Sequence, residues 1–215
     1  ETIVRTATRL FAQQGYPGTS MSDLARECGI SKPLLYHYVS DKYELLSEIT
    51  ESHVTRLEAL VGEVASLGLA PAPRLRELIR RFVHEYAQAR HDHGVLTQDV
   101  KFLEPKDRNR VLRKERAVVA AFAATIAQAR PELAQAALDK PLTMLLFGMI
   151  NWMFTWLRPD GRLDHAAMAP LVVNLFMGGL DHLQVPSNVG APASRSASRS
   201  RSASRSKKLQ QETSA

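Results

Sequence analysis

The turn over residues 29–31 constrains this chain more than any other feature, because it joins two short segments with clear helix boundaries. In the segment before the turn, Ser20 is placed to cap a helix and Asp23 to complete a capping box. Gly29 suits the C-terminal end of that helix. The turn closes on a serine that can cap a second helix, expected over residues 32–38. Two short helices joined in this way form a helix-turn-helix, whose second helix is free to enter a groove.

The rest of the chain also has helical periodicity, and no alternating strand pattern persists in it. The first helix is expected to end at Gly15. Asp41 and Glu44 predict a capping box for a long helix from Lys42 to about Leu67. Further helices are expected over residues 73–90, 94–103, 107–129, 132–157 (with a break at Pro141) and 165–183. The predicted fold class is therefore all-α.

The basic composition comes mainly from the C-terminal end of the chain. The net charge over 215 residues is +6, but residues 194–215 hold six Lys and Arg against Glu212, which leaves only +1 for the remainder. From residue 187 onward the chain consists largely of Ser, Arg and Ala, a composition that predicts disorder. Residues 1–50 carry a net charge of −1, so binding of nucleic acid must depend on where a few cations are placed.

Several classes of protein are disfavoured by the sequence. No stretch reaches the roughly 20 apolar residues of a membrane helix, so no membrane contact is expected. The single cysteine, Cys28, cannot form an internal disulfide, which fits a cytoplasmic protein. An enzyme is the main competing class, but residues 84–86 and 91–93 do not form a metal motif. No nucleophile elbow or glycine-rich phosphate loop is present. We therefore expect no catalytic residue, no metal and no cofactor.

The residues expected to be exposed on the helix over 32–38 have side chains that suit DNA. The helix N-termini at Ser31 and Asp41 attract phosphate, and a lysine follows each of them. Tyr36 and His37 can donate hydrogen bonds to phosphate oxygens, which orients a protein on the duplex without selecting a sequence. Tyr38 could serve either as a core residue or as a phosphate contact.

The first turn of the same helix could contact base edges. Pro33 and Leu34 could pack on thymine methyl groups, and Lys32 could reach a guanine edge. Leu34 could equally be an exposed helix residue without a role.

The segment LFAQQGYPGTSMSDLARECGISKPLLYHYVSDKYELL resembles the DNA-binding region of the TetR family of bacterial transcriptional regulators, over about residues 3–49. The resemblance implies that residues 32–38 are the recognition helix and that Lys42 contacts phosphate. The expected DNA-binding residues are Thr19, Ser20, Ser31, Lys32, Pro33, Leu34, Tyr36, His37 and Lys42. Pro33-Leu34 departs from the family, which often has a small residue followed by Thr or Asn. Val39 departs as well, because Phe is commoner there. The operator sequence therefore stays open.

The same resemblance implies a domain order and a homodimer. It places a three-helix DNA-binding domain at residues 1–49, joined by the long helix to a helical ligand-binding and dimerisation domain at 50–186, with the tail at 187–215. The last two long helices are expected to dimerise. The residues support this arrangement, because the segment 142–157 is apolar nearly all round and must be covered on every side.

An apolar ligand cavity is expected in the second domain. Its predicted lining is Phe82, Tyr86, Val100, Phe122, Met149, Trp152, Met153 and Trp156. Any one of these residues could instead be plain core packing. An open cavity above about 300 Å³ would favour a ligand, and a filled core would favour a domain that only dimerises.

Two further segments, NWMFTWLRPDGRL and LTQDVKFLEPKDRNRVLRKER, resemble the branch of the family that responds to acyl-CoA thioesters in fatty-acid or phenylacetate catabolism. Cations that could bind the phosphates of CoA are Lys101, Lys106, Arg108, Arg110, Arg113, Lys114 and Arg116. They could also merely solvate a helix face and pair with Asp99, Asp107 and Glu115.

The resulting expectation is a repressor that binds a palindromic operator as a homodimer. A small molecule would release it, expected to be an acyl-CoA such as phenylacetyl-CoA or a fatty acyl-CoA. Two alternatives remain open at this stage: a regulator that responds to a different hydrophobic ligand, and a constitutive DNA-binding dimer without an effector.

Overall fold

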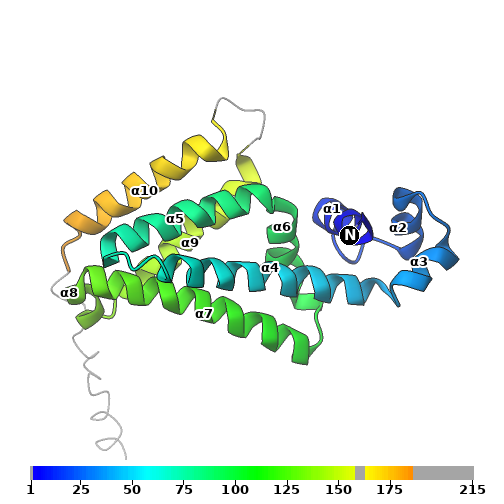
Figure 1. Ribbon diagram of the computed structural model, residues 1–215, viewed down its shortest axis with the longest axis horizontal. Helices are drawn as coiled ribbons and strands as arrows, with labels where there is room; N and C mark the ends of the chain where they lie inside the picture. The colour runs from blue at the N-terminus through cyan, green and yellow to red at the C-terminus, as the bar shows by residue number, and fades with distance from the viewer. Residues whose placement is uncertain (1, 158–162, 186–215) are drawn as a thin grey trace, which may run out of the picture. The chain divides into compact units, whose positions relative to one another are not determined.

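Ten α-helices and one short 3-10 helix follow one another along the chain in the computed structural model, which describes residues 2–157 and 163–185 (Figure 1). The N-terminal helices are α1 (Thr2–Gln14), α2 (Met21–Cys28), α3 (Lys32–Tyr38) and α4 (Lys42–Ala65). They are followed by α5 (Pro71–Gln88), α6 (Arg90–Asp99), η1 (Val100–Phe102), α7 (Pro105–Ala129), α8 (Pro131–Gln135), α9 (Asp139–Trp156) and α10 (His165–His182). The described residues contain no strand, and the predicted all-α class is confirmed. Residues up to Gln184 form one compact unit, and of the residues that follow only Val185 is described.

The helix boundaries around the turn form as the sequence predicts. The Ser20 hydroxyl accepts a hydrogen bond from the backbone N–H of Asp23, and the Asp23 carboxylate accepts one from the N–H of Ser20 (both 3.1 Å). Gly29 has φ +67°, a left-handed conformation that favours glycine. Ser31 caps α3 by accepting from the N–H of Leu34 at 3.3 Å. Two complete helix boundaries thus enclose a turn of three residues.

The capping box before α4 differs slightly from the prediction. Asp41 caps the helix by accepting from the N–H of Glu44 at 2.9 Å. The Glu44 carboxylate, however, accepts from the N–H of Ser40 at 2.8 Å, one residue before the cap. The backbone N–H groups of Ser40 and Glu44 therefore both have a hydrogen-bond partner, and α4 begins where it was expected.

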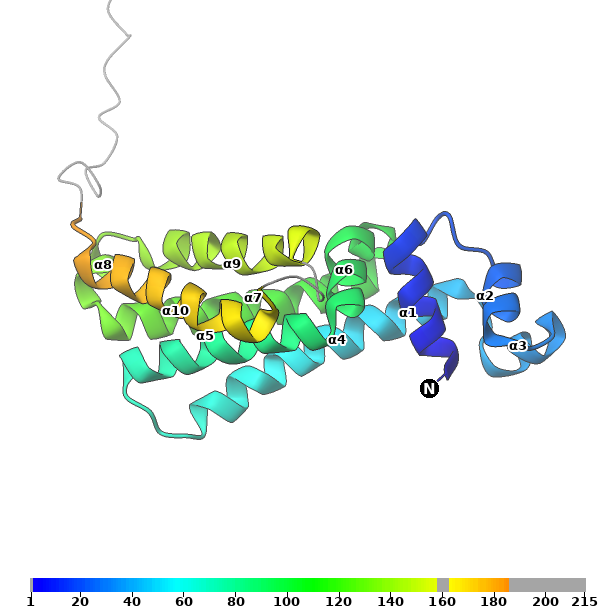
Figure 2. The same cartoon turned by 90° about the horizontal axis from the view of Figure 1, so that it is seen from above.

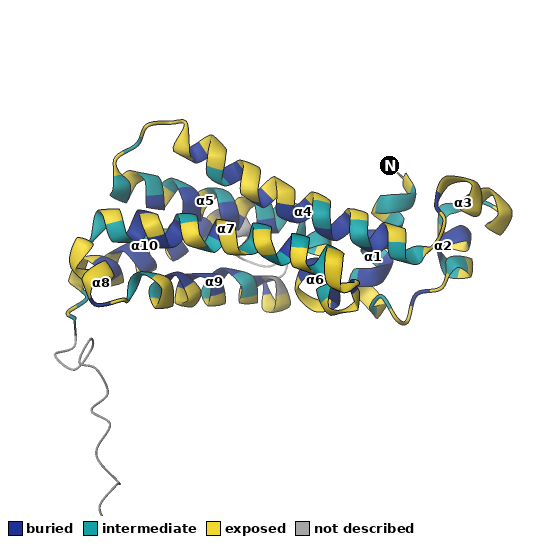
Figure 3. Cartoon of the chain, turned by 90° about the horizontal axis from the view of Figure 1, so that it is seen from below, coloured by how far each residue is buried: buried dark blue, intermediate teal, exposed yellow. Residues whose placement is uncertain are grey.

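Helix α4 runs from the N-terminal helices α1–α3 into the bundle formed by the later helices (Figures 1 and 2). Helix α4 packs with α1, and Leu45 near its N-terminal end is fully buried, as are Leu24 on α2 and Leu35 on α3. Along the rest of its length α4 packs against α5, α6 and α7. Figure 3 colours the ribbon by burial and shows buried residues recurring along these helices.

An aromatic cluster forms the core of the second half. The ring of Phe122 lies 4.9 Å from that of Phe82 and 5.0 Å from that of Phe147, both in edge-to-face geometry. These rings come from α7, α5 and α9, and α10 covers the far side of α5. None of the helices in the described ranges is both long enough and apolar enough to cross a membrane.

Several predicted boundaries in the second half are wrong. The predicted helix over 132–157 is two helices, and it breaks at residues 136–138, where Ala137 has φ +56°. Pro141 causes no break, because it lies in the first turn of α9, where no intrahelical N–H bond is lost. Helices α5 and α7 each begin two residues earlier than predicted, at Pro71 and Pro105, since proline suits the first helical position. Helix α6 begins at Arg90 instead of residue 94.

Candidate DNA-contact surface and effector cavity

The outer face of α3 is an exposed surface of mixed basic, aromatic and apolar character (Figure 3). Its exposed residues are Ser31, Lys32, Pro33, Leu34, Tyr36, His37 and Tyr38. Beneath them Leu35 and Val39 are buried and fix the helix on the core. The Lys32 ammonium lies 6.0 Å from the centre of the Tyr36 ring. Six predicted DNA-binding residues therefore share one surface, and Tyr38, left open by the sequence, lies on it with 63% exposure.

The other three predicted DNA-binding residues are engaged within the protein. Thr19 is only 1% exposed, and its hydroxyl donates to the carbonyl of Gly15 at 3.0 Å. The Ser20 hydroxyl is used in the cap of α2. Lys42 Nζ donates to the backbone carbonyls of Tyr16 (2.9 Å) and Thr19 (3.0 Å). A phosphate contact by Lys42 would have to replace these internal bonds.

Two of the side-chain contacts to the second half involve residues close to the helix-turn-helix, Tyr16 and Tyr43. The Asp99 carboxylate at the end of α6 accepts from the N–H of Tyr16 at 3.2 Å, and burial raises the pKa of Asp99. The Tyr43 hydroxyl on α4 donates to the Asp107 carboxylate on α7 at 2.7 Å. Movements of α6 or α7 would therefore reach α1 and α4 directly.

A cavity of about 220 Å³ lies between α4, α5, α6, α7 and α9. Its lining is Leu57, Tyr86, His93, Leu96, Thr97, Glu115, Val118, Val119, Met144, Phe147 and Asn151. We call it the inner cavity. Most of its wall is apolar, with a few polar groups interspersed, which is the usual composition of a small-molecule site.

One histidine, His93, lines the inner cavity, and a second, His53, lies against it. His93 on α6 stacks on the ring of Tyr86 with 3.7 Å between ring centres. His53 on α4 lies 3.3 Å from it, measured from His53 Nε2 to His93 Nδ1, and both residues are buried. Burial lowers the pKa of His53 to about 4. Burial, with a smaller effect of His53, lowers the pKa of His93 to about 3, and a hydrogen bond with Asn151 acts in the opposite direction. Both rings are therefore uncharged near pH 7.

A wider groove of about 550 Å³ lies between α7 and α9. We call it the outer groove. It shares three lining residues with the inner cavity: Glu115, Val119 and Met144. Burial raises the pKa of Glu115. Two cations, Arg116 and Lys140, line the groove, and neither forms an ion pair among the described residues.

The eight residues predicted to line a ligand cavity do not gather in one place. Tyr86 alone lines the inner cavity. Phe82, Phe122 and Met153 are buried core residues, and Val100 is half-buried in η1, outside the lining. Met149 lines a groove between α9 and α10, while Trp152 and Trp156 are 67% and 50% exposed. The two tryptophans lie on the outer side of α9 because the inner side is filled by Phe147, Ile150 and Met153.

The predicted basic cluster is also divided. Arg110 pairs with Glu51 (2.6 Å) and Asp107 (2.9 Å), and Lys114 lies 3.8 Å from Glu58. These cations hold α7 against α4. Of the seven predicted cations, Arg116 is the one that lines the outer groove.

An apolar surface extends over α9 and α10. Its large exposed side chains are Leu145, Trp152, Trp156, Leu171 and Leu175. A groove of about 340 Å³ between the two helices lies within it. Exposed apolar side chains in this number, on adjoining helices, are typical of a protein interface.

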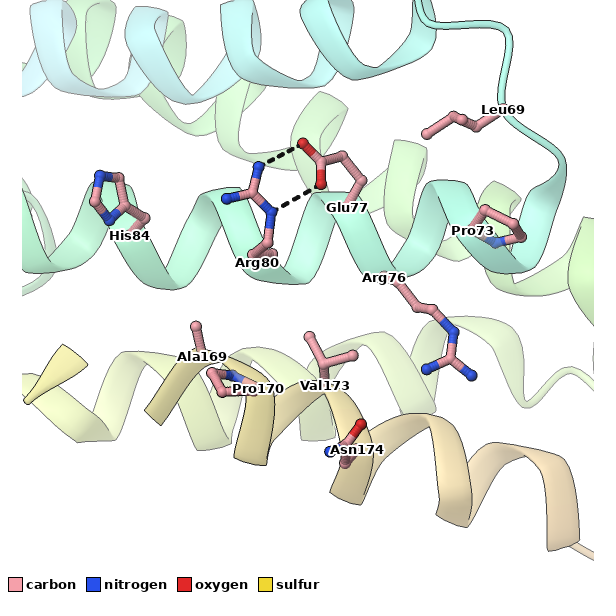
Figure 4. A pocket seen from close by; sticks show the side chains of 10 residues that line it. All are labelled: Leu69, Pro73, Arg76, Glu77, Arg80, His84, Ala169, Pro170, Val173 and Asn174. Atoms are coloured by element: carbon pink, nitrogen blue, oxygen red, sulfur yellow. Dashed lines mark hydrogen bonds and ion pairs between the residues drawn. The ribbon is translucent and has the colours of Figure 1, made fainter. Parts of the chain in front are cut away.

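A further groove of about 500 Å³ separates α5 from α10 (Figure 4). Arg80 makes two hydrogen bonds to the carboxylate of Glu77 (2.7 and 2.8 Å), and these bonds lower the pKa of Glu77 to about 2. Arg76 and His84 also line this groove. It shares no lining residue with the inner cavity.

Four polar residues of the inner cavity were not predicted from the sequence: His93, Thr97, Glu115 and Asn151. His93 was noticed only as part of a possible metal motif, and Glu115 only as a partner for nearby cations. Asn151 is one of three polar residues, with Thr143 and Thr155, that interrupt the apolar segment 142–157, and this interruption was its local signal for a polar role.

Two family models, both of TetR-like regulators, match most of the described chain. Residues 3–49 match the family model for bacterial regulatory proteins of the tetR family, and residues 68–180 match the Tetracyclin repressor-like C-terminal domain. A crystal structure of a TetR-family transcriptional regulator from Bordetella parapertussis is 34% identical, with a TM-score of 0.79, over 86% of this chain and 97% of that one.

Two other relatives have more specific descriptions. AibR in complex with isovaleryl coenzyme A and operator DNA is 26% identical, with a TM-score of 0.71, over 80% of this chain and 95% of that one. The HTH-type transcriptional repressor KstR2 of Mycobacterium tuberculosis is 25% identical over 83% of this chain and 90% of its own length.

Proposed function

Because the chain belongs to the TetR family of bacterial transcriptional regulators, we propose that it is a homodimeric repressor released from its operator by a short-chain acyl-CoA. The family establishes a DNA-binding transcriptional regulator and confirms the expected class over that of an enzyme. The homodimer, the palindromic operator, the effector and action in the cytoplasm are the proposed parts.

The exposed face of α3 supports the proposed DNA contact. Lys32, Pro33 and Leu34 lie at the N-terminal end of the helix, where the residues of a recognition helix approach base edges. Tyr36 and His37 lie further along and can donate to phosphate oxygens. A helix this short, on a domain with little net charge, binds weakly by itself, so two copies on one operator are needed.

The apolar surface of α9 and α10 supports the proposed homodimer. A twofold dimer brings the same patch of both subunits together, so one exposed apolar surface is sufficient. In the active dimer the two α3 helices would lie about 34 Å apart, in successive major grooves of a palindromic operator.

The observation that carries the effector proposal is the wall shared by the inner cavity and the outer groove. An acyl-CoA needs a small apolar chamber for its acyl group and an open, cationic surface for its phosphates. The inner cavity supplies the chamber, and the outer groove supplies two cations, Arg116 and Lys140, beside the acidic residues Glu115 and Asp139. The complex of AibR with isovaleryl coenzyme A shows that a relative of this fold binds a short acyl-CoA.

The volume of the inner cavity limits the acyl group. At about 30 Å³ for each water-sized group, 220 Å³ holds roughly seven such groups. We therefore propose a short acyl chain, such as isovaleryl or butyryl, in preference to a long fatty acyl chain. A phenylacetyl group, with about nine non-hydrogen atoms, exceeds this volume.

One observation favours a second function, a constitutive DNA-binding dimer without an effector. The inner cavity is smaller than the roughly 300 Å³ at which ligand sites usually begin. Against this, the cavity wall carries five polar residues, Tyr86, His93, Thr97, Glu115 and Asn151, which could bind the polar part of a ligand.

The proposed release follows from the helices that line the inner cavity and also contact the N-terminal helices. An acyl group in the inner cavity would contact α6 and α7, and their bonds to Tyr16 and Tyr43 lead to α1 and α4. The ligand would favour a spacing of the α3 helices that does not match the operator, so that repression ends by population shift.

The decisive experiment measures linkage in both directions. Operator fragments would be selected from genomic DNA, and the dissociation constant of the complex measured with isovaleryl-CoA, butyryl-CoA and free CoA. We expect the two thioesters, but not CoA, to weaken operator binding, and operator DNA to weaken thioester binding by the same factor. Operator affinity that stays constant with every thioester, long-chain ones included, would leave the constitutive dimer as the function.

A further inference from the structure

Two of the polar residues on the wall of the inner cavity have no hydrogen-bond partner among the described residues. His93 and Asn151 hydrogen-bond each other, and the Thr97 hydroxyl donates to the backbone carbonyl of His93 at 2.9 Å. The Tyr86 hydroxyl and the Glu115 carboxylate, in contrast, form no hydrogen bond with any described residue. Buried polar groups in proteins are nearly always hydrogen-bonded, so these two groups point to a missing partner.

Tyr86 offers a hydrogen-bond donor and Glu115 an acceptor. Tyr86 is almost fully buried, and burial, with a smaller effect of the Glu115 charge, raises the pKa of its hydroxyl. The hydroxyl therefore keeps its hydrogen near pH 7. Burial also raises the pKa of Glu115, against a smaller opposite effect of Arg116, because a carboxylate removed from water without a hydrogen bond is costly. Both residues line the inner cavity, so one ligand group there can contact both.

A hydroxyl is a small group that satisfies both residues, because its oxygen accepts a hydrogen bond and its hydrogen is donated in another. A butyryl or isovaleryl chain meets only half of this requirement. Its carbonyl oxygen can accept from Tyr86, but the chain has no group that donates to Glu115. A 3-hydroxybutyryl chain adds one oxygen to butyryl and stays within the roughly seven water-sized groups that the cavity holds.

We propose that the effector is a short hydroxyacyl-CoA, whose chain hydroxyl accepts from the Tyr86 hydroxyl and donates to the Glu115 carboxylate. The inference rests on the proposed acyl-CoA effector and names the class of its acyl group. A site built to hydrogen-bond a hydroxyl discriminates against the analogue that lacks it, because its own polar groups then stay unpaired. Tyr86 stacks on His93 of α6 and Glu115 lies on α7, so this ligand contacts the two helices that are bonded to Tyr16 and Tyr43.

The test compares butyryl-CoA with the two enantiomers of 3-hydroxybutyryl-CoA. Binding of each compound to the full-length protein would be measured by isothermal titration calorimetry. We expect one enantiomer to bind at least about tenfold more tightly than butyryl-CoA, which corresponds to about 1.4 kcal/mol. If neither enantiomer binds more tightly than butyryl-CoA, the inference is overturned and the acyl-CoA effector stands. Binding of none of the three compounds would overturn both.

Variants separate recognition of the hydroxyl from a structural role. Tyr86→Phe keeps the ring that stacks on His93 but lacks the donor, and Glu115→Leu lacks the acceptor. In both variants the affinity ratio between the preferred enantiomer and butyryl-CoA should fall to about one, while butyryl-CoA binding shows that the site is intact. Glu115→Gln retains an acceptor oxygen and should keep part of the ratio.

The matched control is Thr125→Val, which removes a buried hydroxyl of α7 that is bonded to the carbonyl of Ala121 and lies outside the cavity lining. This control should keep the full ratio. A full ratio in either Tyr86→Phe or Glu115→Leu would overturn the assignment.

Discussion

Replacing Leu175 with alanine should weaken the proposed dimer about 100-fold. Leu175 lies on α10 and is 69% exposed. The substitution removes three carbon atoms, each worth about 0.8 kcal/mol when fully buried. About two-thirds of that total, about 1.6 kcal/mol, is available for burial against a partner. A twofold interface contains the residue twice, so the loss is about 3 kcal/mol.

Sedimentation equilibrium over nanomolar to micromolar concentrations would measure the dimer dissociation constant. The matched control is Leu67→Ala, since Leu67 is 48% exposed in the connection between α4 and α5, away from the α9–α10 surface. We expect the control to stay within about threefold of the original protein. An unchanged constant for Leu175→Ala, or equal effects of the two substitutions, would refute the assignment of this surface to dimerisation.

Other predictions concern the DNA surface, the α1–α2 connection and the histidines. Tyr36→Ala should weaken binding to operator and unrelated duplexes alike, by about tenfold, because phosphate contacts carry no sequence information; a loss confined to one base position in a competition assay would contradict this. Lys42→Met should lower the melting temperature in calorimetry by several degrees, because two carbonyls lose a charged donor worth about 2 kcal/mol; an unchanged midpoint would count against it. Lowering the pH from 7 to 5 should destabilise the fold in urea titrations. The pKa values of His53 (about 4) and His93 (about 3) lie below that of an unfolded histidine, about 6.5, so the unfolded chain binds protons first. This stability is fully present above about pH 6.5 and falls as the pH drops toward 4, with a loss of about 2 kcal/mol for each histidine at pH 5. His53→Phe should flatten the dependence, and an equal slope in that variant would exclude the pair as its cause.

Local signals in the sequence were sufficient to predict the helix boundaries of the N-terminal half. The caps at Ser20, Ser31 and Asp41 and the left-handed Gly29 all form, because each depends only on residues within three or four positions along the chain. The exposed face of α3 was predictable for the same reason, since helical periodicity decides which side chains lie opposite Leu35.

The lining of the inner cavity was not predictable in this way. The segment from 142 to 157 is apolar nearly all round, so its periodicity could not show that Trp152 faces outward and Met153 inward. The break at Ala137 and the early start of α6 were missed because neither has a strong local marker.

By itself, the sequence determined the helical class, the helix-turn-helix and its exposed face, because capping and periodicity act over one or two helical turns. Only the tertiary structure decided that His53 and His93, 40 positions apart, form a buried pair beside a small cavity. It also decided that Thr19 and Lys42 are engaged internally and that the tryptophans lie on the surface. The physical reason is that burial and hydrogen bonding between helices depend on how whole helices pack, which no local pattern of residues specifies.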